Sequence, residues 1–171
     1  IFLVAVFKRL VEWWQKEQFE KTGQLFIPNA FDLKEILSNS IYGVDIEETS
    51  VRLSVFSISI ALCDMLTPTE IWTELRFDNL RENNIYEGNF FKYLNECESK
   101  DFDLVIGNPP FEDKFKGFKS LLSEFNITCE YRIPRNQIAM LFLQQAMKLL
   151  KPNGLLSLVM PSGPLLYNNT L

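Results

Sequence analysis

Apolar residues recur along the first twenty residues at the spacing of one face of an α-helix. Val6, Phe7, Leu10 and Val11 share that face, and charged residues stand between them. The spacing predicts a helix over residues 1 to about 20, and the glycine, proline and asparagine over residues 23–29 predict a loop after it.

Short apolar runs of strand length occur at residues 41–46, 102–106 and 155–160, with a weaker candidate at 84–87. A helix over 51–62 is predicted between the first two runs, because acidic and hydroxyl residues follow Asp45 as they do at helix starts. A second helix is predicted over 138–149, closing near Lys148 and Lys151 before Pro152 and Gly154. Residues 112–135 are expected to form a loop insert, and residues 67–84 show no clear period.

Strands that alternate with helices predict an α/β fold with a mostly parallel sheet and helices on both faces. The strands are nearly continuous in apolar residues, so they are expected to be buried on both faces. No internal repeat or low-complexity segment interrupts this pattern.

Composition fits one globular domain, since 47% of the 171 residues are hydrophobic and 23% are charged. The net charge of −5 lacks the excess of lysine and arginine usual in proteins that hold a phosphate backbone alone. The absence of histidine excludes histidine metal sites and histidine general bases from this chain, and no metal site is predicted. Three widely spaced cysteines and no signal sequence favour a cytoplasmic setting. No apolar run approaches the ~20 residues that span a membrane.

Ligands bind parallel α/β sheets at the carboxyl ends of the strands, and polar residues stand at three such ends. Asp45 can accept hydrogen bonds from the two hydroxyls of a ribose, and Ile46 can pack on an adenine face. Asn89, after the turn residue Gly88, can bind a base edge. A solvated or helix-capping aspartate and an ordinary turn remain the alternatives.

The sequence Asn108-Pro109-Pro110-Phe111 carries the most specific chemistry. The two prolines fix the backbone, and the Asn108 side-chain oxygen and the Pro109 carbonyl could accept hydrogen bonds from one amino group. Two acceptors would localise the nitrogen lone pair, which then attacks a methyl donor; the catalysis needs positioning and dipoles. Phe111 would stack on a base flipped out of the duplex. The alternative is a rigid Pro-Pro turn.

These residues resemble the S-adenosylmethionine-dependent amino-methyltransferases of the Asn-Pro-Pro-Phe type. Residues 103–111 are similar to the catalytic motif of that family, residues 41–46 to its cofactor-ribose segment, and 149–154 to a later helix-to-strand segment. Residues 88–91 resemble its adenine-binding turn, where aspartate is usual and Asn89 stands here. The resemblance implies a Rossmann-like fold, S-adenosylmethionine as cofactor, cofactor contacts from Asp45, Ile46, Asn89 and Phe90, and Asn108 to Phe111 as catalytic residues.

The long helix expected after Asp45 and the inserts look most like adenine-specific DNA methylases of restriction-modification systems, either single-chain type IIG enzymes or related modification subunits. The opening residues resemble the segment after the glycine-rich cofactor loop of the family, so residues 1–171 are expected to be a partial catalytic domain without that loop and its first strand. No target-recognition domain is evident, and such a domain or a restriction domain is expected in a full-length protein.

Several other functions fit the sequence less fully. Similar motifs occur in methylases of guanine N2 in ribosomal RNA and of glutamine side chains in proteins. A non-catalytic scaffold or DNA-binding fragment would account for the lack of a glycine-rich loop and for Asn89. A dinucleotide-binding dehydrogenase would leave Asn108 to Phe111 unexplained.

Overall fold

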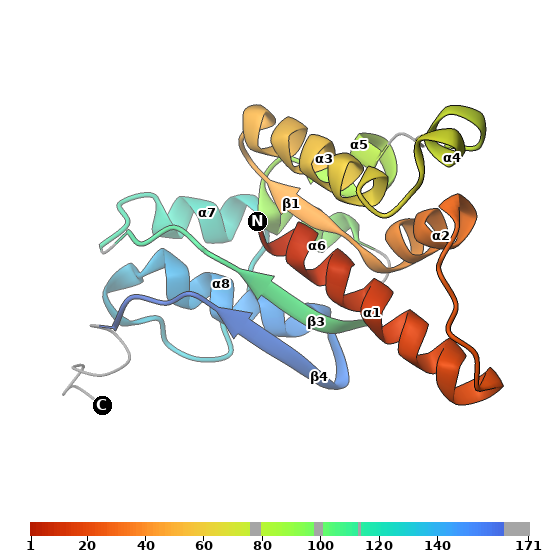
Figure 1. The fold of residues 1–171 in the computed structure, drawn as a ribbon. Helices are drawn as coiled ribbons and strands as arrows, with labels where there is room; N and C mark the ends of the chain where they lie inside the picture. Colours follow the sequence, from red (N-terminus) through yellow and green to blue (C-terminus); the bar gives the residue numbers. More distant parts are fainter. Residues whose placement is uncertain (76–79, 98–100, 113, 163–171) are drawn as a thin grey trace. The chain divides into compact units, whose positions relative to one another are not determined.

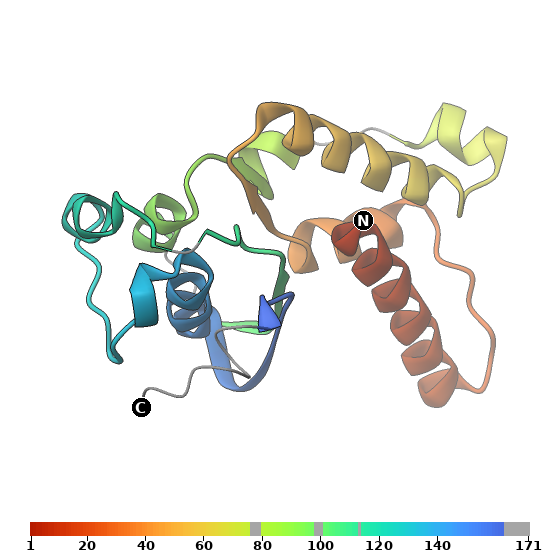
Figure 2. The ribbon, with the colours of Figure 1, turned by 90° about the vertical axis from the view of Figure 1, so that its left-hand side faces the viewer.

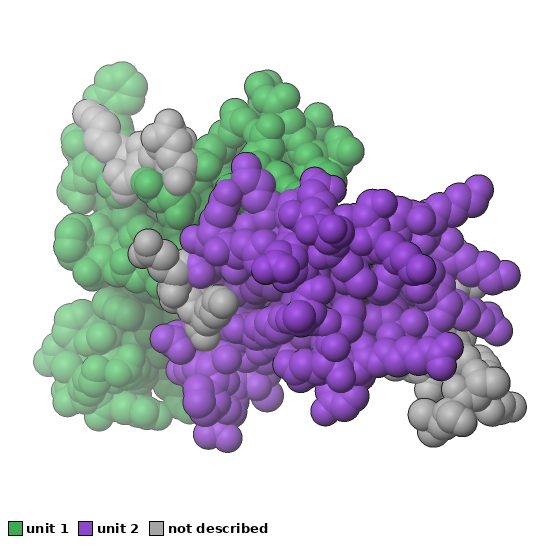
Figure 3. Space-filling model, turned by 180° about the vertical axis from the view of Figure 1, so that it is seen from behind, with its two compact units in different colours: residues 1–90 green, residues 91–171 purple. Residues whose placement is uncertain are grey.

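The computed structural model describes residues 1–75, 80–97, 101–112 and 114–162. The chain divides into two compact units, Ile1–Phe90 and Phe91–Leu171, which are coloured separately in Figure 3. Within the described residues, no helix is long and apolar enough to cross a membrane. Each unit contains one two-stranded parallel sheet and several helices (Figure 1).

The first unit surrounds strands β1 and β2, which pair in parallel with Val44 opposite Tyr86. Helix α3 contacts both strands and also packs against α1. The core is supplied mainly by α1, α2 and α3, with Phe7, Leu33 and Ile58 fully buried; each such side chain stabilises the fold by roughly 1.5–3 kcal/mol. The elements are α1 (Phe2–Thr22), α2 (Ala30–Ser40), β1 (Gly43–Asp45), α3 (Glu48–Cys63), α4 (Pro68–Thr73), α5 (Leu80–Asn83) and β2 (Ile85–Glu87).

Local sequence sets several of these helix ends. Gly23 ends α1 in the left-handed conformation, with φ of 71°, and its amide donates to the Phe19 carbonyl. The chain then runs back beside α1 (Figure 2), where Gln15 Nε2 donates to the Phe26 carbonyl at 3.3 Å. Asn29 begins α2 with a capping box, in which side chains and backbone amides satisfy each other.

The second unit is built on strands β3 and β4, which pair in parallel with Leu104 opposite Leu155 and Gly107 opposite Leu158. Helix α8 packs against α6 through Phe142 and Phe91, whose ring centroids lie 4.8 Å apart. The elements are α6 (Phe90–Glu96, which begins at the last residue of the first unit), β3 (Phe102–Gly107), α7 (Phe118–Glu124), η1 (Pro134–Asn136), α8 (Ile138–Ala146), η2 (Met147–Leu149) and β4 (Leu150–Leu158).

Parallel strands alternating with helices confirm the α/β class, but the expected burial of the strands is wrong. Leu104 is 40% exposed and its partner Leu155 is 68% exposed. The strands belong to two sheets of two strands each, where one larger sheet covered on both faces was expected. A two-stranded sheet has few neighbours, so its apolar side chains are less covered than those of a wide sheet.

Several element boundaries also differ from the prediction. The first strand starts at Gly43, because Ile41 still serves as the C-cap of α2. The helix expected over 138–149 ends at Ala146, and Lys151 lies in β4, where it forms an ion pair with Asp103 of β3. The last strand starts at Leu150, five residues before the apolar run that predicted it, because Leu150 already pairs with β3. It ends at Leu158.

The region over 112–135 is not all loop, because it contains α7 and the short η1 helix. The sequence pattern also gave no prediction for α2, α4, α5 or α6. Two of these carry a recognisable start signal in capping boxes, at Asn29 and at Thr67. The others have four to seven residues, too few for a helical period to be visible.

Candidate active site

The carboxyl ends of β1 and β2 bring together one group of predicted residues. Asp45 ends β1 opposite Glu87, which ends β2, and the Gly88 amide donates to the Asp45 carbonyl at 2.9 Å. Parallel pairing thus places Asp45 next to the turn that leads to Asn89 and Phe90. All four predicted cofactor-binding residues are therefore gathered at one edge of the first sheet.

The Asp45 carboxylate is exposed and partly engaged. Its Oδ1 accepts a hydrogen bond from the Glu47 amide at 2.9 Å, which fixes the side chain in an Asx turn. Among the described residues, no group donates to its second oxygen. Ile46 beside it is 69% exposed. The pair offers a carboxylate oxygen and an apolar surface next to each other.

The turn after β2 depends on Gly88. Its φ of 152° is rarely adopted by residues with a side chain. A Cβ built at this position would lie 2.7 Å from Cε1 of Tyr86. Asn89 and Phe90 follow half-buried, and Phe90 begins α6. The glycine allows the chain to turn closely past Tyr86 and into that helix.

An ionic cluster that the sequence analysis missed lies at the same edge. Arg81 Nη2 is 2.5 Å from Glu87 Oε2 and 3.6 Å from Glu48 Oε1, and Glu48 also pairs with Arg52. The cluster joins the start of α3, at Glu48, to the end of β2, at Glu87. Glu48 follows Asp45 closely in the chain, and Glu87 directly precedes Gly88. Glu48 and Arg52 are far in the chain from Arg81 and Glu87, and only the i,i+4 spacing of Glu48 and Arg52 was visible as a local signal.

The carboxyl end of β3 carries the second group of predicted residues. The Val159 amide donates to the Gly107 carbonyl at 2.9 Å, so the chain after β4 still flanks β3 where Asn108 begins. Asn108 is exposed while Pro109 is buried, so Pro109 anchors the turn and leaves the amide of Asn108 open to solvent. Phe111, three residues on, is 54% exposed.

The turn after β3 thus carries an exposed carboxamide at Asn108 and an exposed ring at Phe111. A large apolar ring loses about 1.5–3 kcal/mol of burial energy when it stays in water. The arrangement can hold a flat apolar ligand against Phe111 and accept hydrogen bonds from it at Asn108. This suits a nucleobase with an amino group.

The structure brings the predicted residues together within two groups. Asp45, Ile46, Asn89 and Phe90 lie in the first unit, and Asn108 to Phe111 lie in the second. No set of three cysteine, aspartate or glutamate residues able to hold a metal ion occurs within the described ranges.

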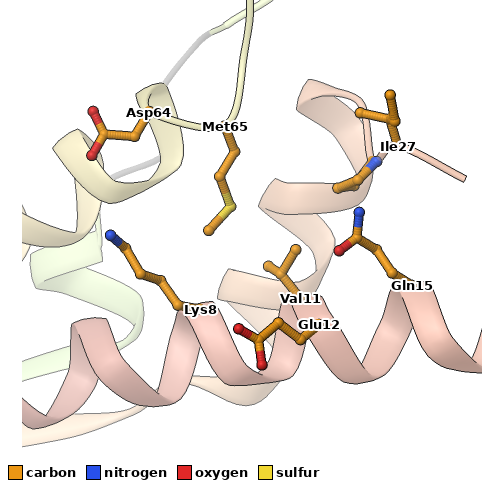
Figure 4. Close-up of a pocket in the computed structure, with 8 residues that line it drawn as sticks. Lys8, Val11, Glu12, Gln15, Ile27, Asp64 and Met65 are labelled. Carbon is orange, nitrogen blue, oxygen red and sulfur yellow. The ribbon is translucent and has the colours of Figure 1, made fainter.

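One pocket of about 310 Å³ lies elsewhere in the first unit (Figure 4). Val11 and Met65 form its apolar wall, and Lys8 faces Asp64 at one end. Lys8 and Val11 lie on α1, and Asp64 and Met65 follow the last residue of α3. Asp45, by contrast, precedes the first turn of α3. The helix has 16 residues, so Asp64 and Asp45 are roughly 24 Å apart along its axis. None of the predicted site residues lines this pocket.

The profile of a family described as Eco57I restriction-modification methylase matches residues 39–171, which is well over half of the chain. This range contains both groups of candidate residues. No curated protein and no solved structure matched.

Proposed function

The chain belongs to the Eco57I restriction-modification methylase family, and on that basis we propose that the protein transfers a methyl group from S-adenosylmethionine to N6 of adenine in DNA. The main support for the proposal is the Asn108–Phe111 turn at the carboxyl end of β3. There an exposed carboxamide, a buried proline and an exposed phenylalanine occur within four residues.

The cofactor is proposed to lie at the end of β1 and β2, and the residues there suit its nucleoside part. The second oxygen of Asp45 would accept hydrogen bonds from the ribose hydroxyls, and exposed Ile46 would pack on the adenine. Asn89 would bind the edge of that adenine, and Phe90 would pack beside it. We assign no residue of the chain to the methionine part of the cofactor.

When bound, S-adenosylmethionine supplies an electrophilic methyl group on a sulfonium. The target amino group would donate its two hydrogens to the Asn108 side-chain oxygen and the Pro109 carbonyl. These contacts orient the nitrogen lone pair toward the methyl group and stabilise the positive charge that develops on the nitrogen. Phe111 would stack on the target base after it leaves the duplex. The proton lost after transfer would pass to solvent, since Asn108 is exposed.

We propose that residues 1–171 are part of one Rossmann-like catalytic domain whose parallel sheet is wider than the β3–β4 pair. The exposed leucines at the β3–β4 pair support this, because a wider sheet with helices on both faces would cover them.

The test is transfer of labelled methyl from S-adenosylmethionine to DNA by the full-length parent protein and by its Asn108→Ala variant. We expect label in N6-methyladenine after digestion to nucleosides, and a fall in kcat of roughly 10²–10³-fold in the variant. Cofactor binding should be unchanged, because Asn108 is not assigned to the cofactor. Label in ribosomal RNA or in protein glutamine, and none in DNA, would contradict the proposed substrate.

A further inference from the structure

Residues 112–138, here called the 112–138 loop, follow Phe111 directly and form a closed loop. The Lys114 amide donates to the Arg135 carbonyl at 3.0 Å, and the Ile138 amide donates to the Glu112 carbonyl at 3.3 Å. Figure 1 shows the chain leaving β3, passing through α7 and returning to α8. The neck of the loop therefore stands beside the candidate catalytic turn.

Buried amides of α8 hold the return path of this loop. Gln144, which is buried, accepts a hydrogen bond from the Glu130 amide at 3.0 Å and donates to the Tyr131 carbonyl at 3.2 Å. Gln145, also buried, donates to the Thr128 carbonyl at 3.2 Å. Side chains that project from this loop into solvent are thus presented from a fixed backbone.

The 112–138 loop is slightly basic, in contrast to the acidic chain as a whole. It carries five positive and four negative charges, a net charge of +1, whereas the chain carries −5. Lys114 and Lys116 are exposed, and neither forms an ion pair with a carboxylate that the structure describes. The basic residues are Lys114, Lys116, Lys119, Arg132 and Arg135.

Two of these residues occupy strained backbone at the neck. Lys114 has φ of 55° and Arg135 has φ of 49°. Glycine or asparagine adopts this left-handed region more readily than lysine or arginine. Strained backbone of this kind concentrates at functional sites. A long basic side chain at Lys114 therefore weakens the fold slightly and needs a reason outside folding.

We infer that Lys114, Lys116 and Arg135 at the neck of the 112–138 loop bind the phosphate backbone of DNA next to the base held at Asn108–Phe111. The inference rests on the proposed function. Lysine and arginine contacts to phosphate supply most of the affinity of such complexes and do not depend on sequence. They position the duplex, so the neck would fix the strand from which the base leaves.

The test measures DNA affinity of the full-length parent protein as a function of salt, by fluorescence anisotropy with a labelled duplex. Lys114→Gln combined with Lys116→Gln removes two proposed phosphate contacts. We expect the slope of log Kd against log salt to fall by about 1.8, since each contact contributes about 0.9, and the affinity near physiological salt to fall about ten-fold or more. Cofactor binding should be unchanged.

The matched control is Lys16→Gln combined with Lys21→Gln on α1, which removes the same charge from exposed lysines in i,i+4 ion pairs. It should leave the salt slope unchanged. Lys114→Gly distinguishes an effect of charge from an effect on folding, because glycine relieves the strain of the left-handed backbone. This variant should unfold at an equal or higher temperature and still bind DNA more weakly. Arginine at both positions should restore the slope.

The outcomes distinguish this inference from the proposed function. DNA methylation by the parent with an unchanged salt slope in the Lys114/Lys116 double variant would overturn the inference alone. The same fall in slope in the Lys16/Lys21 control would also overturn it, because any loss of charge would then suffice. Methyl label absent from DNA would reject the proposed function, and the inference with it.

Discussion

Asn84 offers a test of how the first unit is held together. This buried side chain directly precedes β2, and its Nδ2 donates to the carbonyls of Ser38 and Ile41 at 2.9 Å and 2.8 Å. Both carbonyls lie at the end of α2, where the last turn of a helix lacks intrahelical donors. One carboxamide thereby joins α2 to the sheet that presents Asp45.

Asn84→Ala should lower the free energy of unfolding by about 2–3 kcal/mol. Each lost hydrogen bond is worth about 1 kcal/mol, and a buried acceptor left without a donor costs roughly a further 1 kcal/mol or more. The hydrogen bond to the Ile41 carbonyl is buried, so this carbonyl would be left without a donor. The hydrogen bond to the Ser38 carbonyl is only partly buried, so water can replace the lost donor there.

Asn84→Asp should be worse than Asn84→Ala at neutral pH, although it keeps the shape. The new carboxylate has no donor and would face two carbonyl oxygens in a buried place. Burial and these oxygens raise its pKa above the ordinary value near 4. Because this pKa is raised in the folded state, the loss of unfolding free energy in Asn84→Asp becomes smaller as pH falls through that pKa. The protonated carboxyl group can then donate one hydrogen bond.

The assay is urea unfolding at pH 7 and near pH 4, with Asn83→Ala and Asn83→Asp as controls at the exposed neighbouring position. The controls should change the free energy of unfolding by less than about 0.5 kcal/mol. The reasoning is refuted if Asn84→Ala costs no more than its control, or if Asn84→Asp equals Asn84→Ala at both pH values.

Three other contacts can each be tested by one substitution. Gly154→Ala should destabilise the second unit by about 1–3 kcal/mol, because the new Cβ would lie 2.9 Å from the Phe102 carbonyl oxygen. Faster hydrogen exchange of the β3 amides would show this destabilisation, and unchanged exchange would contradict the prediction. Asn29→Ala should cost about 1 kcal/mol through loss of the α2 cap, measured by thermal unfolding, with no change expected if the cap is absent in solution. Hydrogen bonds from the Thr67 hydroxyl and then its amide hold the pKa of Glu70 below its ordinary value. The Glu70 carboxylate adds to the free energy of unfolding above its unfolded-state pKa, and this stabilisation is lost as pH falls through its folded-state pKa. Thr67→Ala should raise the pKa of Glu70 in an NMR titration, and an unmoved pKa would count against the capping box.

Strongly local features were predictable. The turn at Asn108 and the strand before it were visible because proline must end a strand and because the apolar run is continuous. The α1 helix was visible because its 21 residues give several turns of apolar period. Helix α7 was missed because seven residues give less than two turns, and Lys151 was assigned to a helix end although it pairs with Asp103 across the sheet.

The sequence alone determined the α/β class, the four strands and the two turns where the candidate chemistry stands, because strand ends and helix starts depend on neighbouring residues. The tertiary structure decided which distant residues meet. Arg81 reaches Glu48, and Lys114 meets Arg135 at the neck of a loop, through contacts that leave no period in the chain. It also decided that Leu104 and Leu155 are exposed, because apolar character sets a preference for burial while only packing determines whether a neighbour is there to cover the side chain.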